Sequence, residues 1–458
     1  MHADHSAQGA LASRKAPRNG PFMTPSIFAS DFKARPFWWE AYEPQPLPEI
    51  DLPRETEVVI IGAGYAGLSA ALELRRNGIE CWVIDAAEPG FGGSTRNGGM
   101  VSGGVNVGKG YIAKALPAEQ AEPFLNDAAE AFGHIEDLIA REKIDCGWTR
   151  AGYFVGAWSR AHFAPMQKKV DLLNRHSKAE AYLVPEDKQR EEIGSDFYRG
   201  GLVVGRAGHL HPALYFKGLL DLAQRASVNI ATRTPVNRLI PRDTSIDVKT
   251  SRGTIRARDV IVATNGYTGD ATPAFKRRVV PIGSYIIATE ELPEDLAKAL
   301  SPRNRSIADT QRLLSYYRLS PDGRRMIFGG RAKFSPTDPQ EAAPVLYKMM
   351  TDRFPSLRGT RITHAWTGNV AFTVDELPHM GKFENIHYAL GCNGSGVAMM
   401  SYLGHQIARK VIGRVNRVCA FDRPSFPTHP LYHGKPWFLP YVGGYFRVKD
   451  WIDRRKDQ

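Results

Sequence analysis

The sequence predicts a mixed α/β fold, and three observations carry this prediction. Residues 58–61 are a run of β-branched residues that leads directly into the glycine pattern G-x-G-x-x-G at 62–67. An apolar helical pattern follows, and residues 79–84 then read as a second buried strand, which ends at Asp85. A second strand, glycine turn and helix are expected between residues 386 and 411. The first unit has the element order of a Rossmann-like domain. Because 458 residues are too many for one simple core, we expect two interleaved domains.

The first glycine loop has the residues that a dinucleotide site requires. Gly62 allows the tight turn, and Gly64 lets the backbone approach a pyrophosphate. Gly67 lets the helix pack closely on the strand. The helix N-terminus offers N–H groups and positive dipole potential to the phosphates. Asp85 follows Gly67 by 18 residues and is placed to accept hydrogen bonds from a ribose diol.

The composition indicates an ordinary globular protein, with 43% hydrophobic and 10% aromatic residues. No uninterrupted apolar run approaches the ~18 residues of a transmembrane helix. The first twenty residues carry scattered charges and lack the apolar segment of a secretory signal. We therefore expect a cytoplasmic protein without a transmembrane segment.

Charge and cysteine content argue against a nucleic-acid-binding protein, a disulfide-stabilised protein and a metalloprotein. The net charge of +12 is spread along the chain without a concentrated basic stripe or a nucleic-acid motif, so we expect no nucleic-acid partner. The four cysteines are widely spaced and form no C-x-x-C pattern, which predicts neither a disulfide framework nor a metal site. His209 and His211 precede Pro212, which opens a helix, and capping or packing against a bound cofactor is favoured over metal binding.

The second glycine loop favours one long cofactor that is gripped by distant parts of the chain. Residues 391–397 would put a second helix N-terminus against the other end of that cofactor. Residues 90–99 are also too rich in glycine for a regular element, and they suggest backbone wrapped around a ligand. An ordinary helix-capping turn is the alternative for the loop at 391–397.

Several longer motifs carry a family resemblance through almost all of residues 57–412. They are Gly62–Gly67, Gly90–Gly92, Arg96–Gly99, Gly208–Pro212, Tyr316–Leu319, Trp366–Asn369 and Gly394-x-Gly396. With these motifs the chain resembles the D-amino acid oxidase-type flavin amine oxidoreductases, the superfamily of glycine oxidase and monomeric sarcosine oxidase. Within it, the resemblance is strongest to γ-glutamylputrescine oxidase-like proteins.

The resemblance implies a Rossmann-like FAD-binding domain interleaved with a substrate domain built on an antiparallel sheet. It also implies oxidation of a primary or secondary amine by hydride transfer to flavin N5, which gives an imine that hydrolyses. O2 or another acceptor would reoxidise the flavin. The substrate would be a small amine that carries a carboxylate or other anion, such as an amino acid, an N-alkyl amino acid or a γ-glutamyl-polyamine.

Other functions share the same motifs. A quinone-linked dehydrogenase of cyclic imino acids such as pipecolate is one alternative. A flavoprotein that acts on or with RNA and a flavin-binding subunit of a larger complex are two more. The protein is expected to be a monomer or a homo-oligomer.

The order of elements together with the resemblance predicts the domain organisation. The expected parts are a partly disordered N-terminal arm at 1–55; the FAD-binding domain at 56–110, 206–275 and 366–415; the substrate domain at 111–205 and 276–365; and a C-terminal tail at 416–458. The tail is aromatic and basic between Trp437 and Trp451. Packing over the core is its simplest interpretation, with contact to a membrane or a dimer partner as alternatives.

The resemblance also assigns site residues. Those expected to bind FAD are Gly62, Ala63, Gly64, Tyr65, Ala66, Gly67, Asp85, Ala86, Gly93, Ser94, Thr95, Arg96, Asn97, Gly98, Gly99, Val236, Ala263, Thr264, Asn265, Gly266, Gly391, Cys392, Asn393, Gly394, Ser395, Gly396 and Val397. Those expected at the substrate are Arg318, Tyr317, Arg96 and Trp366. The candidates for binding the substrate anion are Arg96, Arg318 and Arg331, with Arg318 favoured among them. The alternative for Arg318 is that it faces outward and pairs with an acid. Cys392 stands where related proteins have another residue, so we expect FAD to be bound non-covalently.

Overall fold

The computed structural model describes residues 26–102, 104, 116–334, 337–415 and 417–457. One large sheet of these residues is mainly antiparallel. Its strands, in spatial order, are β1 (Phe28–Lys33), β17 (Ile362–Phe372), β13 (Val280–Thr289), β16 (Met326–Gly330), β15 (Ser315–Leu319), β14 (Ser306–Asp309), β5 (Tyr153–Gly156), β7 (Gly201–Val204) and β6 (Ala181–Val184). We call it the substrate sheet.

The other large sheet has a parallel core and contains the first glycine motif; we call it the Rossmann sheet. Its strands are β10 (Val236–Pro241), β11 (Ile246–Thr250), β12 (Gly253–Val262), β2 (Glu55–Ile61), β3 (Cys81–Ile84) and β9 (Asn229–Ala231), and β12 also pairs with β19 (Ile386–Leu390), which pairs with β18 (His379–Phe383). The apolar run at residues 58–61 is buried, as expected for a parallel strand that is covered on both faces.

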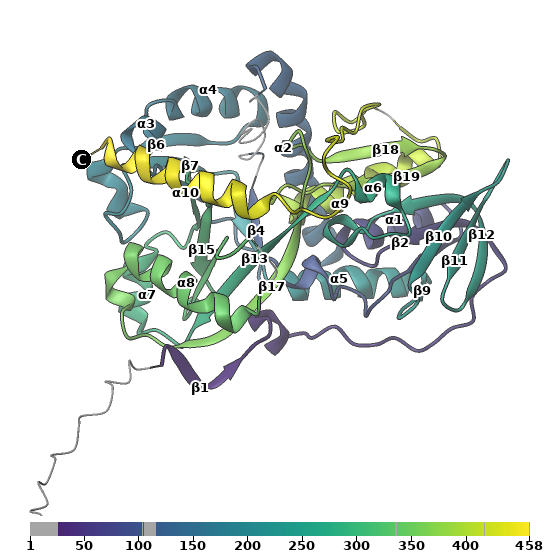
Figure 1. Cartoon of the computed structure of the whole chain (residues 1–458), viewed down its shortest axis with the longest axis horizontal. Coiled ribbons are helices and arrows are strands. Elements are labelled where there is room, and N and C mark those ends of the chain that lie inside the picture. Colours follow the sequence, from purple (N-terminus) through teal and green to yellow (C-terminus); the bar gives the residue numbers. More distant parts are fainter. Residues whose placement is uncertain (1–25, 103, 105–115, 335–336, 416, 458) are drawn as a thin grey trace, which may run out of the picture.

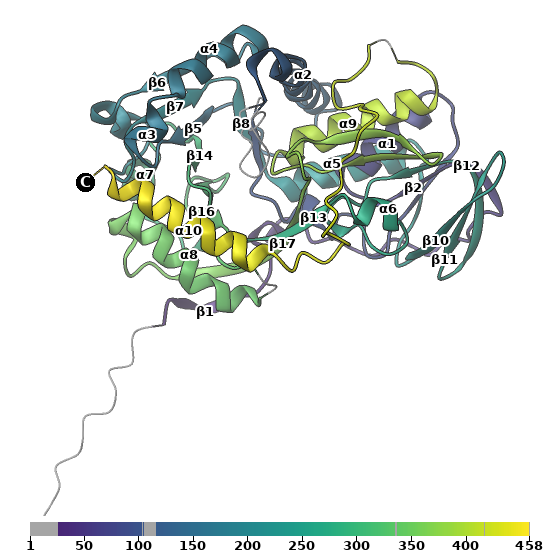
Figure 2. The same ribbon diagram turned by 45° about the horizontal axis from the view of Figure 1, so that its top comes forward.

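Helices cover both sheets (Figures 1 and 2). Their bounds are α1 (Tyr65–Arg76), α2 (Ala118–Glu142), α3 (Arg160–Phe163), α4 (Met166–Ser177), α5 (Pro212–Arg225), α6 (Pro273–Lys276), α7 (Glu294–Leu300), α8 (Pro339–Arg353), α9 (Gly396–Val411) and α10 (Leu439–Arg455). In the Rossmann part, α1 packs on α5 and α9, whereas α8 packs on β13 and β17 of the substrate sheet. Among the described helices, none is both long and apolar enough to cross a membrane.

The chain passes repeatedly between the two sheets, which confirms the predicted interleaved α/β fold. It enters the substrate sheet at β1, β5–β7 and β13–β17, and the Rossmann sheet at β2–β3, β9–β12 and β18–β19. Strands β4 (Met100–Ser102) and β8 (Ala207–His209) pair as a separate two-stranded ribbon. Each of them lies at a point in the sequence where the chain passes from one large sheet to the other.

Two details differ from the expected domain boundaries. The strand β17 is continuous to Phe372, so the chain leaves the substrate sheet after this residue and not before Trp366. In the N-terminal arm, β1 pairs in parallel with β17 and so extends the substrate sheet. Residues 1–25, where disorder is expected, lie outside the described residues.

Candidate functional site

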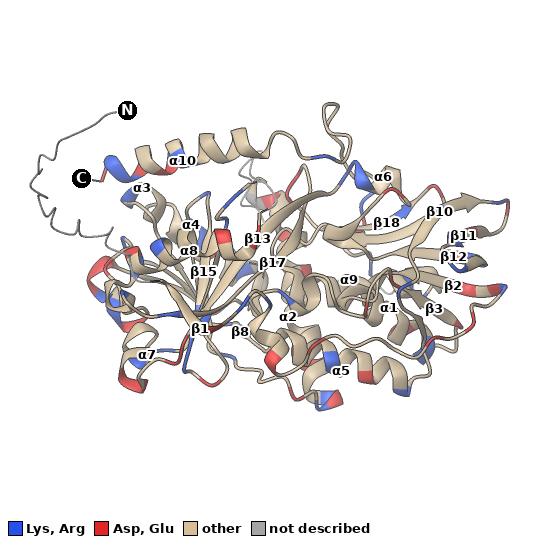
Figure 3. Cartoon of the chain, turned by 60° about the horizontal axis from the view of Figure 1, so that its bottom comes forward, with Lys and Arg blue, Asp and Glu red and all other residues tan. Residues whose placement is uncertain are grey.

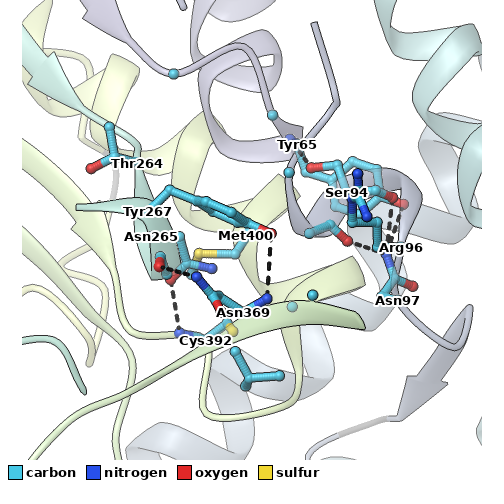
Figure 4. A pocket seen from close by; sticks show the side chains of 18 of the residues that line it. Tyr65, Ser94, Arg96, Asn97, Thr264, Asn265, Tyr267, Asn369, Cys392 and Met400 are labelled. Atoms are coloured by element: carbon cyan, nitrogen blue, oxygen red, sulfur yellow. Dashed lines mark hydrogen bonds between the residues drawn. The ribbon is translucent and has the colours of Figure 1, made fainter. Parts of the chain in front are cut away.

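A cavity of about 690 Å³ lies between the two sheets, within the size range of small-molecule and cofactor sites. The start of α1, the end of β3, the loop at 90–98 and the start of α9 form one part of its wall. Strands β13, β15 and β17 form another part. Figure 4 shows side chains around the same space, namely those of residues 65, 94, 96, 97, 264, 265, 267, 369, 392 and 400.

The first glycine loop has the close contacts that its motif requires. The φ angle of Gly62 is +110°, and a Cβ built there would lie 2.9 Å from the carbonyl oxygen of Ala263. At Gly67 a Cβ would lie 1.8 Å from the carbonyl oxygen of Gly62. A larger residue at Gly62 would clash with the backbone that follows β12, and one at Gly67 would push the start of α1 away from the glycine turn.

Asp85 ends β3 on the cavity wall. Its carboxylate accepts hydrogen bonds from the backbone N–H groups of Ala63 at 2.7 Å and Ala87 at 2.9 Å. Burial raises the pKa of Asp85, while these N–H donors act in the opposite direction. The carboxylate therefore braces the first glycine loop and also presents an acceptor to a ligand in the cavity.

The second glycine loop brings another helix N-terminus to the same cavity. Asn265 Oδ1 accepts hydrogen bonds from the N–H groups of Gly391 at 3.0 Å and Cys392 at 3.3 Å, which joins two loops of the wall (Figure 4). Helix α9 begins immediately afterwards, and Ser395 at its N-cap makes no side-chain capping bond. The first N–H groups of α9 are thus available to acceptors on a ligand.

These features fit a dinucleotide cofactor. Two helices begin at the cavity wall, and Gly64 has no side chain to cap α1. Ser94 Oγ accepts a hydrogen bond from Tyr65 N–H at 3.1 Å and so ties the loop at 93–95 to the first turn of α1. N–H donors for phosphates and a carboxylate for a ribose diol therefore lie around one cavity.

Most residues expected to bind the cofactor line this cavity. They are Gly62, Gly64, Tyr65, Ala66, Asp85, Ala86, Gly93, Ser94, Arg96, Asn97, Gly98, Val236, Ala263, Thr264, Asn265, Gly266, Cys392, Asn393, Gly394, Gly396 and Val397. The six that do not line it are Ala63, Gly67, Thr95, Gly99, Gly391 and Ser395. Two examples show why: Ala63 points its N–H at Asp85, and buried Thr95 donates its hydroxyl to the carbonyl oxygen of Gly90 at 2.9 Å. Such residues support the wall from behind.

Arg96 is a cation on the cavity wall. Its guanidinium lies 4.6 Å from the ring centre of Trp39 and 4.5 Å from that of Phe91. It donates to the carbonyl oxygens of Phe91 at 2.7 Å and Thr367 at 3.3 Å, and burial lowers its pKa. Within the described part of the chain, no carboxylate pairs with Arg96.

The structure corrects the placement expected for Arg318. This side chain is fully buried and does not line the cavity. Its guanidinium donates to the carbonyl oxygens of Gly98 at 2.9 Å, Leu210 at 2.6 Å and Leu319 at 3.3 Å, and burial lowers its pKa to about 9. It joins two loops behind the wall. Its N–H groups satisfy carbonyl oxygens that would otherwise be buried without a hydrogen-bond donor, which costs free energy.

Tyr317 and Trp366 also lie away from the cavity. The Tyr317 ring stacks on Phe328, and its hydroxyl is 2.8 Å from that of Tyr198, within the core on the other side of the substrate sheet. Trp366 donates its indole N–H to the carbonyl oxygen of Arg96 at 2.8 Å and therefore supports the loop that carries Arg96. Neither side chain lines the cavity, although the sequence analysis expects both at the substrate.

Sequence reasoning missed Tyr316, which lines the cavity instead. Its hydroxyl is 2.8 Å from Ser284 Oγ on β13. Strand alternation puts Tyr316 and Tyr317 on opposite faces, but the sequence does not say which face meets the cavity. Arg331 also lines the wall, with its guanidinium 4.6 Å from the ring centre of Phe372.

Arg312 and Tyr267 are further lining residues that no motif marked. Arg312 is neutralised by Asp450 at 2.9 Å and Asp453 at 2.6 Å, both on α10. The hydroxyl of Tyr267 accepts a hydrogen bond from the N–H of Asn369 at 3.3 Å (Figure 4). Contacts between segments so far apart in the chain leave no short sequence pattern.

His211 caps α5, as the sequence analysis favours. Its Nδ1 accepts a hydrogen bond from Leu214 N–H at 3.2 Å. Among the residues that the structure covers, no group of three or more His, Cys, Asp or Glu side chains could hold a metal ion.

The fold and the cavity define a flavin-binding oxidoreductase, and comparison with known proteins agrees. The family model for FAD-dependent oxidoreductases matches residues 57–410, and the chain belongs to this family. FAD is therefore its cofactor. Its non-covalent attachment stays a prediction, as do the individual FAD contacts; Cys392 lines the cavity with its thiol 3.9 Å from the carbonyl oxygen of Ala371.

The chain is also similar to individual known proteins. The γ-glutamylputrescine oxidoreductase of Escherichia coli (strain K12) is 32% identical over 399 residues, which cover 86% of this chain and 92% of the relative. Glycine oxidase from Geobacillus kaustophilus has a TM-score of 0.68 at 16% identity, over 82% of this chain and 99% of the other. L-proline dehydrogenase from P. horikoshii has a TM-score of 0.67 at 19% identity, over 80% and 96% of the two chains. The two structural matches show a shared fold.

Proposed function

We propose that the protein oxidises a primary or secondary amine that also carries a carboxylate or another anion. When bound, FAD supplies a hydride acceptor, so that the C–H next to the amine is oxidised and an imine forms. Water hydrolyses the imine to a carbonyl compound and releases the nitrogen as ammonia or as an amine. O2 or another acceptor takes the electrons in the end. The names of the three relatives, which act on a glutamylated amine, glycine and proline, support this substrate class.

The observation that carries the proposal is a pair of arginines on the cavity wall. Arg96 and Arg331 both line the cavity, and no carboxylate in the described residues neutralises Arg96. Both side chains are half-buried, and a cation partly withdrawn from water favours an anionic ligand, because the solvent screens its charge less there. A substrate carboxylate would find a planar guanidinium that can bind both of its oxygens.

Arg331 takes the role that the sequence analysis gave to Arg318. It lies on the part of the wall that the substrate sheet forms, close enough to Tyr316 for its charge to lower the pKa of that hydroxyl, although burial of the ring raises this pKa further, to about 12. At ordinary pH the Tyr316 hydroxyl is therefore neutral and can donate or accept a hydrogen bond. The aliphatic side chains of Ile282 and Ile286 on β13 also line the cavity and exclude water from the amine.

The test is anaerobic mixing of the FAD-loaded protein with a panel of amines while the loss of flavin absorbance is followed. We expect bleaching by amines with a carboxylate and much weaker bleaching by their neutral amides. Arg331→Met should raise KM for the anionic amine by about ten- to hundredfold, the equivalent of a hydrogen bond to a charged group. KM for the amide should change little. Equal turnover of an anionic amine and its amide by the unmodified protein would refute the proposal.

A further inference from the structure

The outer face of α10 is aromatic where a surface helix is normally polar. Leu439, Gly443, Phe446 and Asp450 are buried against the body of the protein. The opposite face carries side chains that are between 54% and 75% exposed, namely Trp437 just before the helix and Tyr441, Tyr445, Val448 and Trp451 within it. Their spacing of three and four residues puts them in one stripe. The helix has 17 residues and is about 25 Å long.

The acidic side chains of this segment face the body, and its cations are exposed except for Arg454, which donates to the carbonyl oxygens of Trp158 and Phe197. Its three carboxylates bind the body: Asp450 and Asp453 pair with Arg312, and Asp457 accepts a hydrogen bond from Arg160 N–H at 2.7 Å. The cations Arg447, Lys449, Arg455 and Lys456 are exposed. In the described residues, none of these four cations is paired with a carboxylate.

The cations and the aromatic rings form one surface. The guanidinium of Arg455 lies 4.3 Å from the ring centre of Trp451, and Lys449 Nζ lies 5.8 Å from that of Tyr445. Figure 3 shows α10 along one edge of the molecule, where a flat partner can reach the length of the helix. Exposed apolar patches of this kind mark interaction sites.

We propose that the outer face of α10 binds the surface of a membrane that contains anionic phospholipids. Tryptophan and tyrosine rings are favoured at the depth of the lipid headgroups, and basic side chains beside them attract anionic headgroups. A second copy of the chain is a poorer occupant. A two-fold dimer through this face would bring the same cations of both copies together.

The helix also connects this surface to a segment of the cavity wall. Asp450 accepts hydrogen bonds from the N–H groups of Arg312 at 3.1 Å and Leu313 at 3.2 Å, and Arg312 lines the cavity. The turn at 311–313 therefore packs against the buried side of α10, and the proposed membrane-binding face lies on the opposite side of the helix. This inference concerns where the protein is held, and it stands independently of the amine proposed as substrate.

The test is flotation of the full-length, FAD-loaded protein with vesicles. One set contains phosphatidylcholine alone, and the other contains phosphatidylcholine with phosphatidylglycerol. We expect the protein to float with the anionic vesicles, much less with the neutral ones, and less at high salt because salt screens the attraction. Failure of the unmodified protein to float with anionic vesicles would overturn the proposal.

Two double variants identify the face. Tyr445→Ser with Trp451→Ser, and Lys449→Glu with Arg455→Glu, should each lower partitioning by about tenfold or more. The matched control, Arg225→Glu with Lys382→Glu, makes the same charge change at exposed positions on α5 and β18 and should float normally. Flavin absorbance shows that each variant remains folded.

Two outcomes would contradict the role of the face. An equal loss of flotation in the control would mean that net charge alone attracts the protein to vesicles. A dimer that Tyr445→Ser with Trp451→Ser converts to monomers, without any vesicle binding, would show that the face joins two copies of the chain.

Discussion

At the scale of single residues, the neighbours of each side chain decide its role. Asp85 and Arg318 are both charged groups that bind backbone, Asp85 half-buried and Arg318 fully buried. The carboxylate lies on the cavity wall, whereas the guanidinium lies behind it. Asp85 therefore has access to a ligand, whereas Arg318 contributes to the stability of the loops.

Asp85→Ala should weaken FAD binding. The change removes an acceptor from the N–H groups of Ala63 and Ala87 and from the expected ribose contact. A lost hydrogen bond to a charged group corresponds to about a ten- to hundredfold higher Kd for FAD. Fluorescence titration of the apoprotein measures this Kd. Unchanged retention of FAD by the variant would contradict a contact with the ribose, and the amine preference of the loaded variant serves as the control.

Arg318→Met should destabilise the protein without acting selectively on anionic substrates. The variant leaves the carbonyl oxygens of Gly98, Leu210 and Leu319 without their donor, at a cost of about 1–3 kcal/mol for each one that water cannot reach. Urea unfolding measures the loss. A normal unfolding free energy together with a higher KM for anionic amines alone would restore the role that the sequence suggested for this residue.

At the scale of elements, helix termini define the site and its supports. Helices α1 and α9 begin at the cavity, and a Cβ at Gly404 would lie 2.1 Å from the carbonyl oxygen of Ala66, so the two helices cross closely. This crossing brings two N-termini to one ligand. Helix α5 is capped differently, by the buried side chain of His211.

The cap of α5 predicts a pH dependence of stability. Burial lowers the pKa of His211 to about 4, below its value of about 6.5 in the unfolded chain. Between these values the unfolded chain binds a proton that the folded protein does not, so stability falls as the pH falls. From pH 7 to pH 5 this one histidine costs about 2 kcal/mol.

The measurement is urea unfolding at both pH values, with His211→Asn for comparison. Asparagine can also cap a helix but does not titrate in this range. The variant should therefore lose less stability between pH 7 and pH 5 than the unmodified protein. Buried His209, whose pKa is lowered to about 2, contributes in the same direction in both proteins. Equal pH dependence of the two proteins would contradict the prediction.

At the scale of the whole molecule, the cavity joins the two sheets. Its wall includes the Rossmann sheet near Gly62 and the substrate sheet near Ile282 and Tyr316. A ligand that fills it therefore contacts both halves of the interleaved chain. Because such a ligand binds the folded state and not the unfolded chain, its binding stabilises the whole molecule against unfolding.

Added FAD should raise the unfolding temperature of the apoprotein. At a free FAD concentration of 100 times Kd, the stabilisation is about 2.7 kcal/mol, and it grows with the logarithm of the concentration. A thermal unfolding series with increasing FAD measures this dependence. Asp85→Ala should shift the series to higher FAD concentrations, and an unfolding temperature independent of FAD would show that the cofactor does not fill this cavity.

The amino-acid sequence by itself determined the local parts of the site. A turn at Gly62, a close helix at Gly67 and an acid at the end of the next strand are consecutive features, so a short pattern specifies them. From the family motifs, the interleaved fold and the cofactor FAD could also be predicted. Most of the residues expected around FAD do line the cavity.

Only the tertiary structure decided which side chains line the cavity. The alternation of β15 puts Tyr316 and Arg318 on one face and Tyr317 on the other, yet Arg318 is covered by the carbonyl groups of residues 98 and 210 while Tyr316 reaches the cavity. Arg312 depends in the same way on Asp450, which lies 138 residues later in the chain. Such contacts join segments distant in sequence, where local propensity and spacing carry no information and the packing of the whole chain sets the neighbours.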